Sequence, residues 1–456
     1  MSLRTAPPPA FDSLRPPEAE VIADCVHCGF CLPACPTYRL WANEADSPRG
    51  RIHLMDAALH GELALSPELA GHWDACLGCM ACVPACPSGV RFDRLIERTR
   101  QQVERRLRRP LGQRLLRSAL FAVLPHRRRV RAVAYALMVY RSAGVERQLR
   151  RPIVQRHLPE SLRTVQRLVP PVTAASLRRV TRRHVAAMGR RRARVVLLEG
   201  CVQGAMFSEV NAATARVLAA HGCDVVVPVG QGCCGALELH AGRESAARER
   251  ALALLALIER DNVDRFVVNS AGCGSAMKAY DDLLAESWGW TRRAARFTPL
   301  VRDVMELLAE LQADTKPSLH PLPLRVAYHD ACHLAHAQGI RLQPREVLRR
   351  IPELTLIDVP EGDVCCGSAG VYNLLQPLTA AELGRAKAEA IRGTGADVVA
   401  TGNPGCVLQI RAWLSAAGAG MPVLHPVQLV DASLRGRHPL DVLEHRRRPS
   451  RRGDMP

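Results

Sequence analysis

The spacing of the cysteines constrains the fold of this 456-residue chain more than any other feature. Two stretches read C-x-x-C-x-x-C-x-x-x-C-P, beginning at Cys25 and at Cys76. In this pattern three thiolates from one tight loop bind one [4Fe–4S] cluster, and the fourth binds the other cluster. The sequence therefore predicts two clusters, one held by Cys25, Cys28, Cys31 and Cys86 and the other by Cys76, Cys79, Cys82 and Cys35.

Zinc and disulfide bonds explain these cysteines less well. A zinc site usually contains two C-x-x-C pairs separated by a long spacer, with no third cysteine two residues further on. Disulfide frameworks are typical of small secreted domains. This chain is long, and its sequence shows no export signal and no apolar run that could cross a membrane. We therefore expect reduced thiolates that bind metal in a cytoplasmic protein.

The second half of the chain is an internal repeat that the remaining cysteines mark. Cys201 recurs as Cys332, Cys233-Cys234-Gly235 recurs as Cys365-Cys366-Gly367, and Cys273 recurs as Cys406. Each position follows a short apolar run, from Val195–Leu198 before the first to Val398–Ala400 before the last. Because open α/β sheets bind ligands beyond the carboxyl ends of their strands, we expect one cysteine site in each copy.

Four cysteines in each copy are candidates for a shared metal centre. Adjacent cysteines cannot form an unstrained disulfide with each other, and the glycine that follows them allows a sharp turn. The candidate ligands are Cys201, Cys233, Cys234 and Cys273 in copy 1, and Cys332, Cys365, Cys366 and Cys406 in copy 2. The alternative is that they are buried, small hydrophobic residues, which is what we expect of Cys223, the one cysteine outside every set.

The sequence predicts an α+β multidomain protein. The changes in composition divide the chain into a flexible extension (1–20), an α-helical di-cluster 4Fe–4S ferredoxin-type domain (21–100), an Arg-rich helical connector (101–193), two repeated α/β domains (194–318 and 319–435) and a basic tail (436–456). The repeats are assigned from short β-branched runs that alternate with helical stretches, as in βα units around a parallel sheet.

The connector carries most of the positive charge. Residues 94–194 contain 28 arginines and 4 acidic residues, a balance of +24, whereas the whole chain has a net charge of +18. Two short apolar stretches within it, Leu115–Leu124 and Val130–Tyr140, indicate peripheral contact with the inner face of the cytoplasmic membrane. The alternative is that the arginines pair with acidic patches of partner subunits. We do not expect nucleic-acid binding, because this segment contains only three aromatic residues.

Several strings resemble one family of iron–sulfur proteins. They are CVHCGFCLPACPTY, CLGCMACVPACPSGV, GCVQGAMFSEVNAATARVL, GCCGALELHAG and GNPGC. This family includes heterodisulfide reductase, anaerobic glycerol-3-phosphate dehydrogenase, the lactate-utilisation iron–sulfur protein and the glycolate oxidase iron–sulfur subunits, and the strings look most like the last of these. The resemblance extends from about residue 21 to residue 432.

The resemblance implies an electron-transfer subunit of a flavin-dependent 2-hydroxyacid dehydrogenase that converts glycolate to glyoxylate. It implies separate FAD-binding subunits and a quinone-type acceptor, with no catalytic residue on this chain. No G-x-G-x-x-G follows a strand, which also places the flavin on a partner. Lactate and glycerol 3-phosphate stay open as substrates, because another chain selects the substrate.

One departure from the family pattern concerns the repeats. Heterodisulfide reductase-like domains end in a C-x-x-C ligand motif, whose second position here is Ala276 in copy 1 and Gln409 in copy 2. Each copy therefore offers four thiolates, which leaves an ordinary [4Fe–4S] cluster, another metal or a metal-free thiol site as alternatives. The missing cysteine also disfavours thiol–disulfide catalysis, which needs both an attacking and a resolving thiolate.

Overall fold

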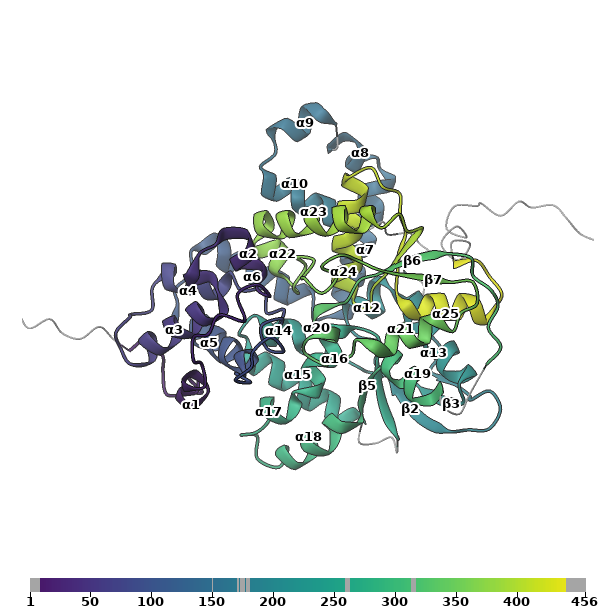
Figure 1. Cartoon of the computed structure of the whole chain (residues 1–456), viewed down its shortest axis with the longest axis horizontal. Coiled ribbons are helices and arrows are strands. Elements are labelled where there is room, and N and C mark those ends of the chain that lie inside the picture. The colour runs from purple at the N-terminus through teal and green to yellow at the C-terminus, as the bar shows by residue number, and fades with distance from the viewer. Residues whose placement is uncertain are drawn as a thin grey trace, which may run out of the picture.

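The structure is a computed structural model that describes residues 9–149, 151–169, 172, 177, 181–258, 263–312 and 317–439. A helical N-terminal domain lies beside two α/β copies, and the later connector helices, from residue 145 to residue 168, rise above them (Figure 1). This arrangement confirms the predicted fold class of a helical domain, a helical connector and two repeated α/β domains.

The N-terminal domain consists of short helices, and proline residues determine where several of them begin. Its helices are α1 (Ala19–Ala23), α2 (Pro36–Trp41), η1 (Glu44–Asp46), α3 (Pro48–Leu59), α4 (Pro67–Asp74) and α5 (Phe92–Arg106). Proline occupies the first position of α2, α3 and α4, where no backbone donor is needed. Both ligand loops are irregular: Cys35 directly precedes α2, whereas Cys86 is followed by a turn before α5 begins. Trp73 and Leu95 lie at the centre of this domain's core.

The N-terminal segment is packed where the structure describes it, contrary to the expected mobile extension. Phe11 is buried, with its ring centroid 5.8 Å from that of Trp73. Arg15 is buried and forms an ion pair with Glu244 of copy 1. An apolar anchor and a buried ion pair therefore attach this segment to the body. Residues 1–8 and the part of the expected basic tail from residue 440 onward lie outside the described residues.

The two copies contain parallel sheets with the same strand order. Copy 1 has β2 (Ala193–Leu197), β3 (Cys223–Val226), β4 (Arg265–Val268) and β5 (Val301–Asp303), in the order β3-β2-β4-β5. Copy 2 has β6 (Arg325–Tyr328), β7 (Thr355–Asp358), β8 (Val398–Ala400) and β9 (Val423–Leu424), in the order β7-β6-β8-β9. The predicted apolar runs coincide with the first three strands of each copy, and the fourth strands were not predicted. In addition, β1 (His184–Val185) pairs antiparallel with β3.

Helices cover these sheets. Those of copy 1 are α12 (Val202–Met206), α13 (Ser208–Ala220), α14 (Ala236–His240), α15 (Glu244–Ile258), α16 (Ala271–Lys278), α17 (Tyr280–Leu283), α18 (Thr291–Phe297), η2 (Thr298–Leu300) and α19 (Val304–Gln312). Those of copy 2 are α20 (Cys332–Ala335), α21 (Leu342–Arg349), α22 (Tyr372–Leu375), α23 (Pro377–Gly393), α24 (Pro404–Ala416) and α25 (Pro426–Leu434).

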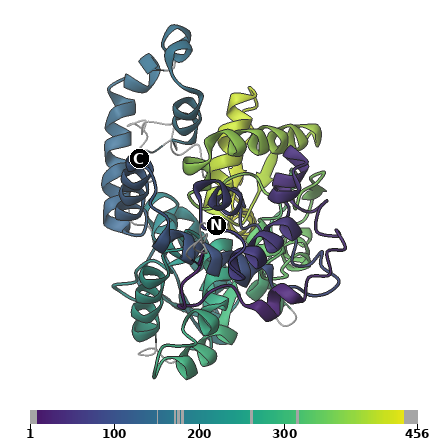
Figure 2. The ribbon, with the colours of Figure 1, turned by 90° about the vertical axis from the view of Figure 1, so that its left-hand side faces the viewer.

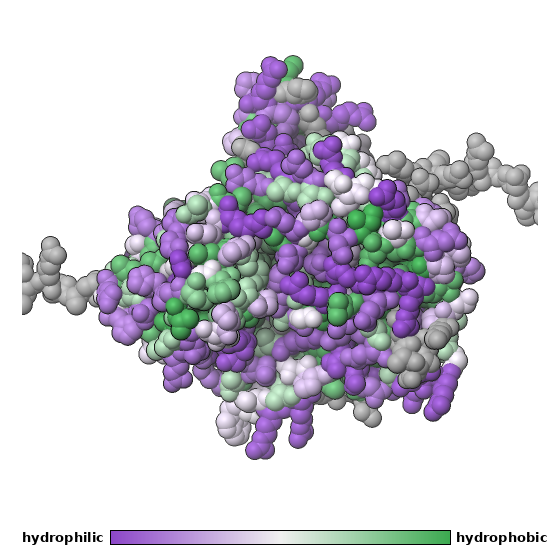
Figure 3. Space-filling model, viewed as in Figure 1, coloured by the Kyte–Doolittle hydropathy of each residue, from purple (hydrophilic) through white to green (hydrophobic). Residues whose placement is uncertain are grey.

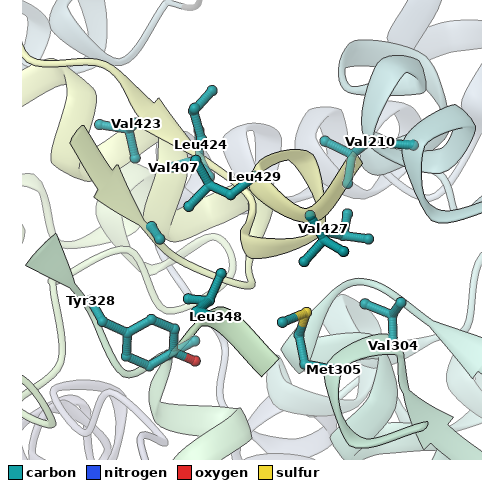
Figure 4. Packing of buried hydrophobic residues seen from close by; sticks show 14 of the residues in the cluster. Val210, Val304, Met305, Tyr328, Leu348, Val407, Val423, Leu424, Val427 and Leu429 are labelled. Atoms are coloured by element: carbon teal, nitrogen blue, oxygen red, sulfur yellow. The ribbon is translucent and has the colours of Figure 1, made fainter. Parts of the chain in front are cut away.

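One hydrophobic core spans both copies, and copy 1 has a second core of its own. Helix α13 packs against α25, and α19 packs against α21. Val210 and Met305 from copy 1 lie in the same buried cluster as Tyr328 and Val427 from copy 2 (Figure 4). At the edge of this cluster the Arg216 guanidinium binds both carboxylate oxygens of Asp431, at 2.7 and 2.6 Å. The repeats are therefore two α/β domains packed against each other through a continuous core.

The connector is fixed to both copies. It forms α6 (Leu111–Val123), α7 (Arg127–Ser142), α8 (Val145–Leu149), α9 (Pro152–His157) and α10 (Glu160–Leu168). Helix α7 packs on α12 of copy 1, and α10 packs on α23 and α24 of copy 2; Figure 2 shows these helices along one side of the molecule. The lobe of α8 to α10 at the top of Figure 3 is largely hydrophilic. Among the described residues, no helix is long and apolar enough to cross a membrane.

Candidate metal centres

The first predicted set of cysteines surrounds a hollow near the protein surface. Cys25, Cys28, Cys31 and Cys86 all line it. Cys28 is exposed and the other three are half-buried. Gly29 has a φ of +88°, and a Cβ atom there would lie 2.9 Å from Nη1 of Arg49. Arg49 in turn donates a hydrogen bond of 2.8 Å to the His27 carbonyl, which fixes the loop around the hollow.

The second predicted set surrounds a deeper hollow. Cys35, Cys76, Cys79 and Cys82 line it, and all four are buried. Burial raises the pKa of the Cys79 and Cys82 thiols well above its usual value, so a bound cation is needed to keep these sulfurs ionised. The Gly78 N–H donates to Cys76 Sγ at 3.3 Å, and Arg51 Nη1 lies 3.9 Å from Cys35 Sγ. These donors suit negatively charged sulfur ligands.

The structure thus places the four cysteines of each predicted set around one hollow. In each set, three cysteines come from one motif and the fourth comes from the other motif. Cys86 of the second motif lies with the first loop, and Cys35 of the first motif lies with the second loop. Cys82 lines both hollows, so the hollows are neighbours. By the chemistry of the donors, four thiols around each hollow fit a [4Fe–4S] cluster. Among the described residues, no three His, Cys, Asp or Glu side chains form a group that could hold a single metal ion.

The cysteines of copy 1 meet at the ends of β2, β3 and β4. The Cys201 thiol donates to Cys233 Sγ over 3.4 Å, and the Gly235 N–H reaches the same sulfur at 3.4 Å. Hydrogen bonding by Cys201, and then by Cys234, lowers the pKa of Cys233 well below its usual value. Hydrogen bonding to Cys233 and to Cys273, together with burial, raises the pKa of Cys234. All four predicted thiols are therefore close enough to influence one another.

The cysteines of copy 2 repeat this arrangement. Cys332 begins α20, the adjacent Cys365 and Cys366 follow β7, and Cys406 lies in the first turn of α24. A hydrogen bond with Cys365, together with burial, raises the pKa of Cys332 well above its usual value. Gln409, at the position where the family pattern has a further cysteine, is buried and donates to the Ala380 carbonyl at 2.8 Å. This side chain therefore has a structural role in the helix packing.

Copy 2 lies against the deeper hollow of the N-terminal domain. Cys79 belongs to one packed cluster with Cys365 and Tyr372, and Cys332 packs against that cluster. His333 Nε2 donates to the Gly78 carbonyl at 2.8 Å, and the Tyr372 hydroxyl donates to the Ala75 carbonyl at 3.1 Å. Sequence analysis did not identify His333 or Tyr372. In the sequence, only the proximity of His333 to Cys332 and of Tyr372 to Cys366 pointed to a role near the cysteine site.

Glycines make the turns that present the paired cysteines. Gly367 has a φ of +86°, and a Cβ atom there would lie 2.8 Å from the Ala380 carbonyl oxygen. Gly235 in copy 1 has a φ of +80° and a similar contact of 3.0 Å with the Ala247 carbonyl oxygen. Only glycine fits these two positions without strain.

We expect Gly367→Ala to destabilise the protein by about 1–3 kcal/mol, because the new methyl group combines an unfavourable φ with a backbone clash. The measurement is the midpoint of thermal unfolding, which should fall by several degrees. Gly393→Ala is the matched control, since a Cβ atom at Gly393 would have nothing within 4 Å. Equal midpoints for the two variants would contradict this account of the turn.

Comparisons with known proteins agree with this architecture. Family models match residues 21–90 (4Fe-4S dicluster domain), residues 112–169 (glycolate oxidase iron-sulfur subunit, linker region), and residues 195–278 and 326–411 (cysteine-rich domain). The chain is 35% identical to the "Probable glycolate oxidase iron-sulfur subunit" of Bacillus subtilis, over 92% of this chain and 95% of the relative. It is 34% identical to the glycolate oxidase iron-sulfur subunit of Escherichia coli, over 91% and 94%. Lactate utilization protein A of an Exiguobacterium is 24% identical over 53% of this chain and 98% of the relative.

Proposed function

The chain belongs to the family of glycolate oxidase iron–sulfur subunits, and from this premise we propose that it transfers electrons within a complex that oxidises glycolate to glyoxylate. FAD-binding subunits carry out the oxidation, and this chain passes the electrons to a quinone-type acceptor. The observation that carries the proposal is the pair of neighbouring thiol-lined hollows, one at the surface and one inside.

The proposal assigns the cysteines of the N-terminal domain as cluster ligands. The outer set is Cys25, Cys28, Cys31 and Cys86, and the inner set is Cys35, Cys76, Cys79 and Cys82. When bound, such clusters accept and release single electrons, which a two-electron flavin donor requires. The two sets of ligands differ in burial. Cys28 of the outer set is exposed, on the side open to a donor, whereas Cys79 of the inner set is buried and faces copy 2.

The cysteines of the repeats are proposed to hold a further iron–sulfur cluster or to act as redox thiols in each copy. Copy 2 is the better placed of the two, because Cys365 packs with Cys79. We propose that electrons leave the N-terminal domain on this side.

The test is co-purification of this chain with FAD-binding candidate partners, followed by dye reduction with glycolate, D-lactate, L-lactate and glycerol 3-phosphate in parallel. The proposal expects the fastest reduction with glycolate. Lactate is the second candidate, because the chain also resembles lactate utilization protein A over the half that the two share. Faster dye reduction with lactate than with glycolate would identify lactate as the substrate of the complex.

The loop around the outer hollow is the surface on which we expect the flavoprotein partner to dock. Val26 and Phe30 within this loop are each 67% exposed, although both are large and apolar. Aromatic side chains that become buried on binding carry much of the affinity of an interface. Docking here also places the partner's flavin close to the outer cluster ligands.

We therefore expect Phe30→Glu to weaken binding of the flavoprotein partner about tenfold or more, because truncating such an anchor costs over 1 kcal/mol. The measurement is the affinity of the purified chains, with iron content recorded for each variant. Trp288→Glu is the matched control, since Trp288 is 98% exposed and belongs to copy 1 rather than to this loop. Weakening by Trp288→Glu alone, at unchanged iron content, would place the interface elsewhere.

A further inference from the structure

A cavity of about 300 Å³ lies where the N-terminal domain, the connector and both copies meet. Residues of α4, α5, α6, α14 and α22 line it. Cys76, one of the inner cysteines, lines its wall, as does His333 beside Cys332. The cavity therefore adjoins both the inner hollow and the cysteine site of copy 2. Its volume is that of a small-molecule site.

Most of the cavity wall is apolar. Leu77 and Leu107 come from the N-terminal side, Leu237 from α14, and Val371 and Leu375 from the loop and helix after Cys366. A planar organic ring would be buried well by such walls, since ligand pockets combine apolar surface with a few polar groups.

Three of the four arginines on the wall are engaged within the protein, and the fourth, Arg108, has no ion pair or side-chain hydrogen bond among the described residues. Arg100 donates to the carbonyls of His240 and Cys76, Arg109 binds Asp74, and Arg117 binds Glu104. The wall therefore presents one available guanidinium group, that of Arg108, and competition between the ligand and glycolate tests whether this group makes the cavity a carboxylate site.

His240 provides a hydrogen-bonding group for a ligand. Its Nδ1 atom lies 3.0 Å from a carboxylate oxygen of Glu97. Its Nε2 atom is buried and has no hydrogen-bond partner among the described residues. The Nε2 atom accepts a bond from a hydroxyl when the ring is neutral and donates to a carbonyl when the ring is protonated. One residue can thus bond both the carbonyl and the hydroxyl form of a ligand.

One residue of the cavity wall adjoins exposed apolar side chains on α6. Leu116 of α6 lines the cavity and is 44% exposed. On the same helix Leu111 and Leu115 are 72% and 70% exposed. A hydrocarbon tail that left the cavity at Leu116 would cover these two side chains and remove them from water.

We propose that this cavity binds the head group of a quinone-class carrier, with its isoprenoid tail lying along Leu115 and Leu111. This inference rests on the proposed function, because it locates the acceptor of that reaction. Conversion of the quinone to the quinol forms two O–H bonds and consumes two electrons and two protons. Oxidation of one glycolate to glyoxylate on the partner subunits releases both electrons. His240 delivers one proton to a ring oxygen, with Glu97 behind it, and solvent supplies the other.

The experiment measures binding rather than turnover. The full chain, purified anaerobically with its iron, is titrated by calorimetry with a benzoquinone that carries a decyl tail and with the same ring without the tail. We expect both to bind, the tailed form more tightly. Leu116→Trp should raise the Kd of both about tenfold or more by filling the cavity beside it, whereas Ala143→Trp, at an exposed position just after α7 and outside the cavity wall, should leave it unchanged.

Two further variants separate the parts of the site. His240→Phe keeps a ring but removes the hydrogen bond, and should raise the Kd of both quinones about tenfold. Leu115→Ser should weaken the tailed quinone only. No measurable quinone binding would overturn the proposal, as would displacement of the quinone by glycolate, which would make the cavity a carboxylate site. Because dye reduction by the complex is measured separately, either result leaves the test of the proposed function intact.

Discussion

Replacing Cys79 with serine is expected to remove the inner cluster, about four irons per chain, and to stop electron transfer to the acceptor. Serine is close to cysteine in size, but its hydroxyl is a poor substitute for a thiolate on iron. The partner's flavin should still be reduced by substrate, because substrate oxidation takes place on another chain. Iron analysis, acceptor reduction and flavin bleaching together provide the measurement.

The matched control is Cys223→Ser, since Cys223 is buried yet lies outside every cysteine set. It should keep its full iron content even if it loses some stability. Equal iron loss in the two variants would show that Cys79 acts through packing. Zinc in place of iron in the unmodified protein would overturn the cluster assignment itself.

The second large effect is expected at the paired cysteines of the repeats. Cys366→Ser should abolish metal binding by copy 2 and reduce acceptor reduction to background, because this site packs against Cys79. Cys234→Ser should abolish metal binding by copy 1 with a smaller effect on acceptor reduction, because it is copy 2 that contacts the Cys79 loop. Both variants should fold, since the substitution preserves volume.

Metal analysis and acceptor reduction of both variants, at matched thermal midpoints, test this expectation. Full activity with unchanged metal content in both would mean that the paired cysteines only fill the core. A larger loss in Cys234→Ser than in Cys366→Ser would reverse the proposed order of the two copies. Cys223→Ser is again the control, because it shows how much stability is lost when a buried thiol is replaced by a hydroxyl with no ligand involved.

The cysteine sets were predictable because they depend on local spacing. A loop of the form C-x-x-C-x-x-C can place three thiols around one hollow regardless of the path of the rest of the chain. The fourth thiol could be assigned because the motif occurs twice. The strands before Cys201, Cys332 and Cys406 were predictable for a similar reason, since short β-branched runs favour extended backbone. The recurrence of the cysteines predicted the internal repeat, and the structure adds that both sheets have the same strand order.

The features that were not predicted depend on contacts between distant segments. His333 bonds to Gly78 across 255 positions of sequence, and Tyr372 bonds to Ala75 across 297. Nothing local to these residues shows that copy 2 is the one that meets the inner hollow. The two-residue strand β9 is likewise too short to show an alternation of apolar and polar residues. It forms because it can pair with the free edge of β8. The anchoring of Phe11 on Trp73 is also a tertiary contact within a Pro-rich segment that is typical of mobile chain ends.

The core that spans the two copies limits how the chain can be divided. A single repeat on its own would have to cover its α13-like face or form a symmetric pair with a second molecule. In this chain α13 and α25 cover each other, and the Arg216–Asp431 pair joins the halves. Deleting either half would therefore expose the apolar surface of the other. Natural exchange of segments between related proteins should therefore move the two repeats together, with the cluster domain and the connector as the separable parts.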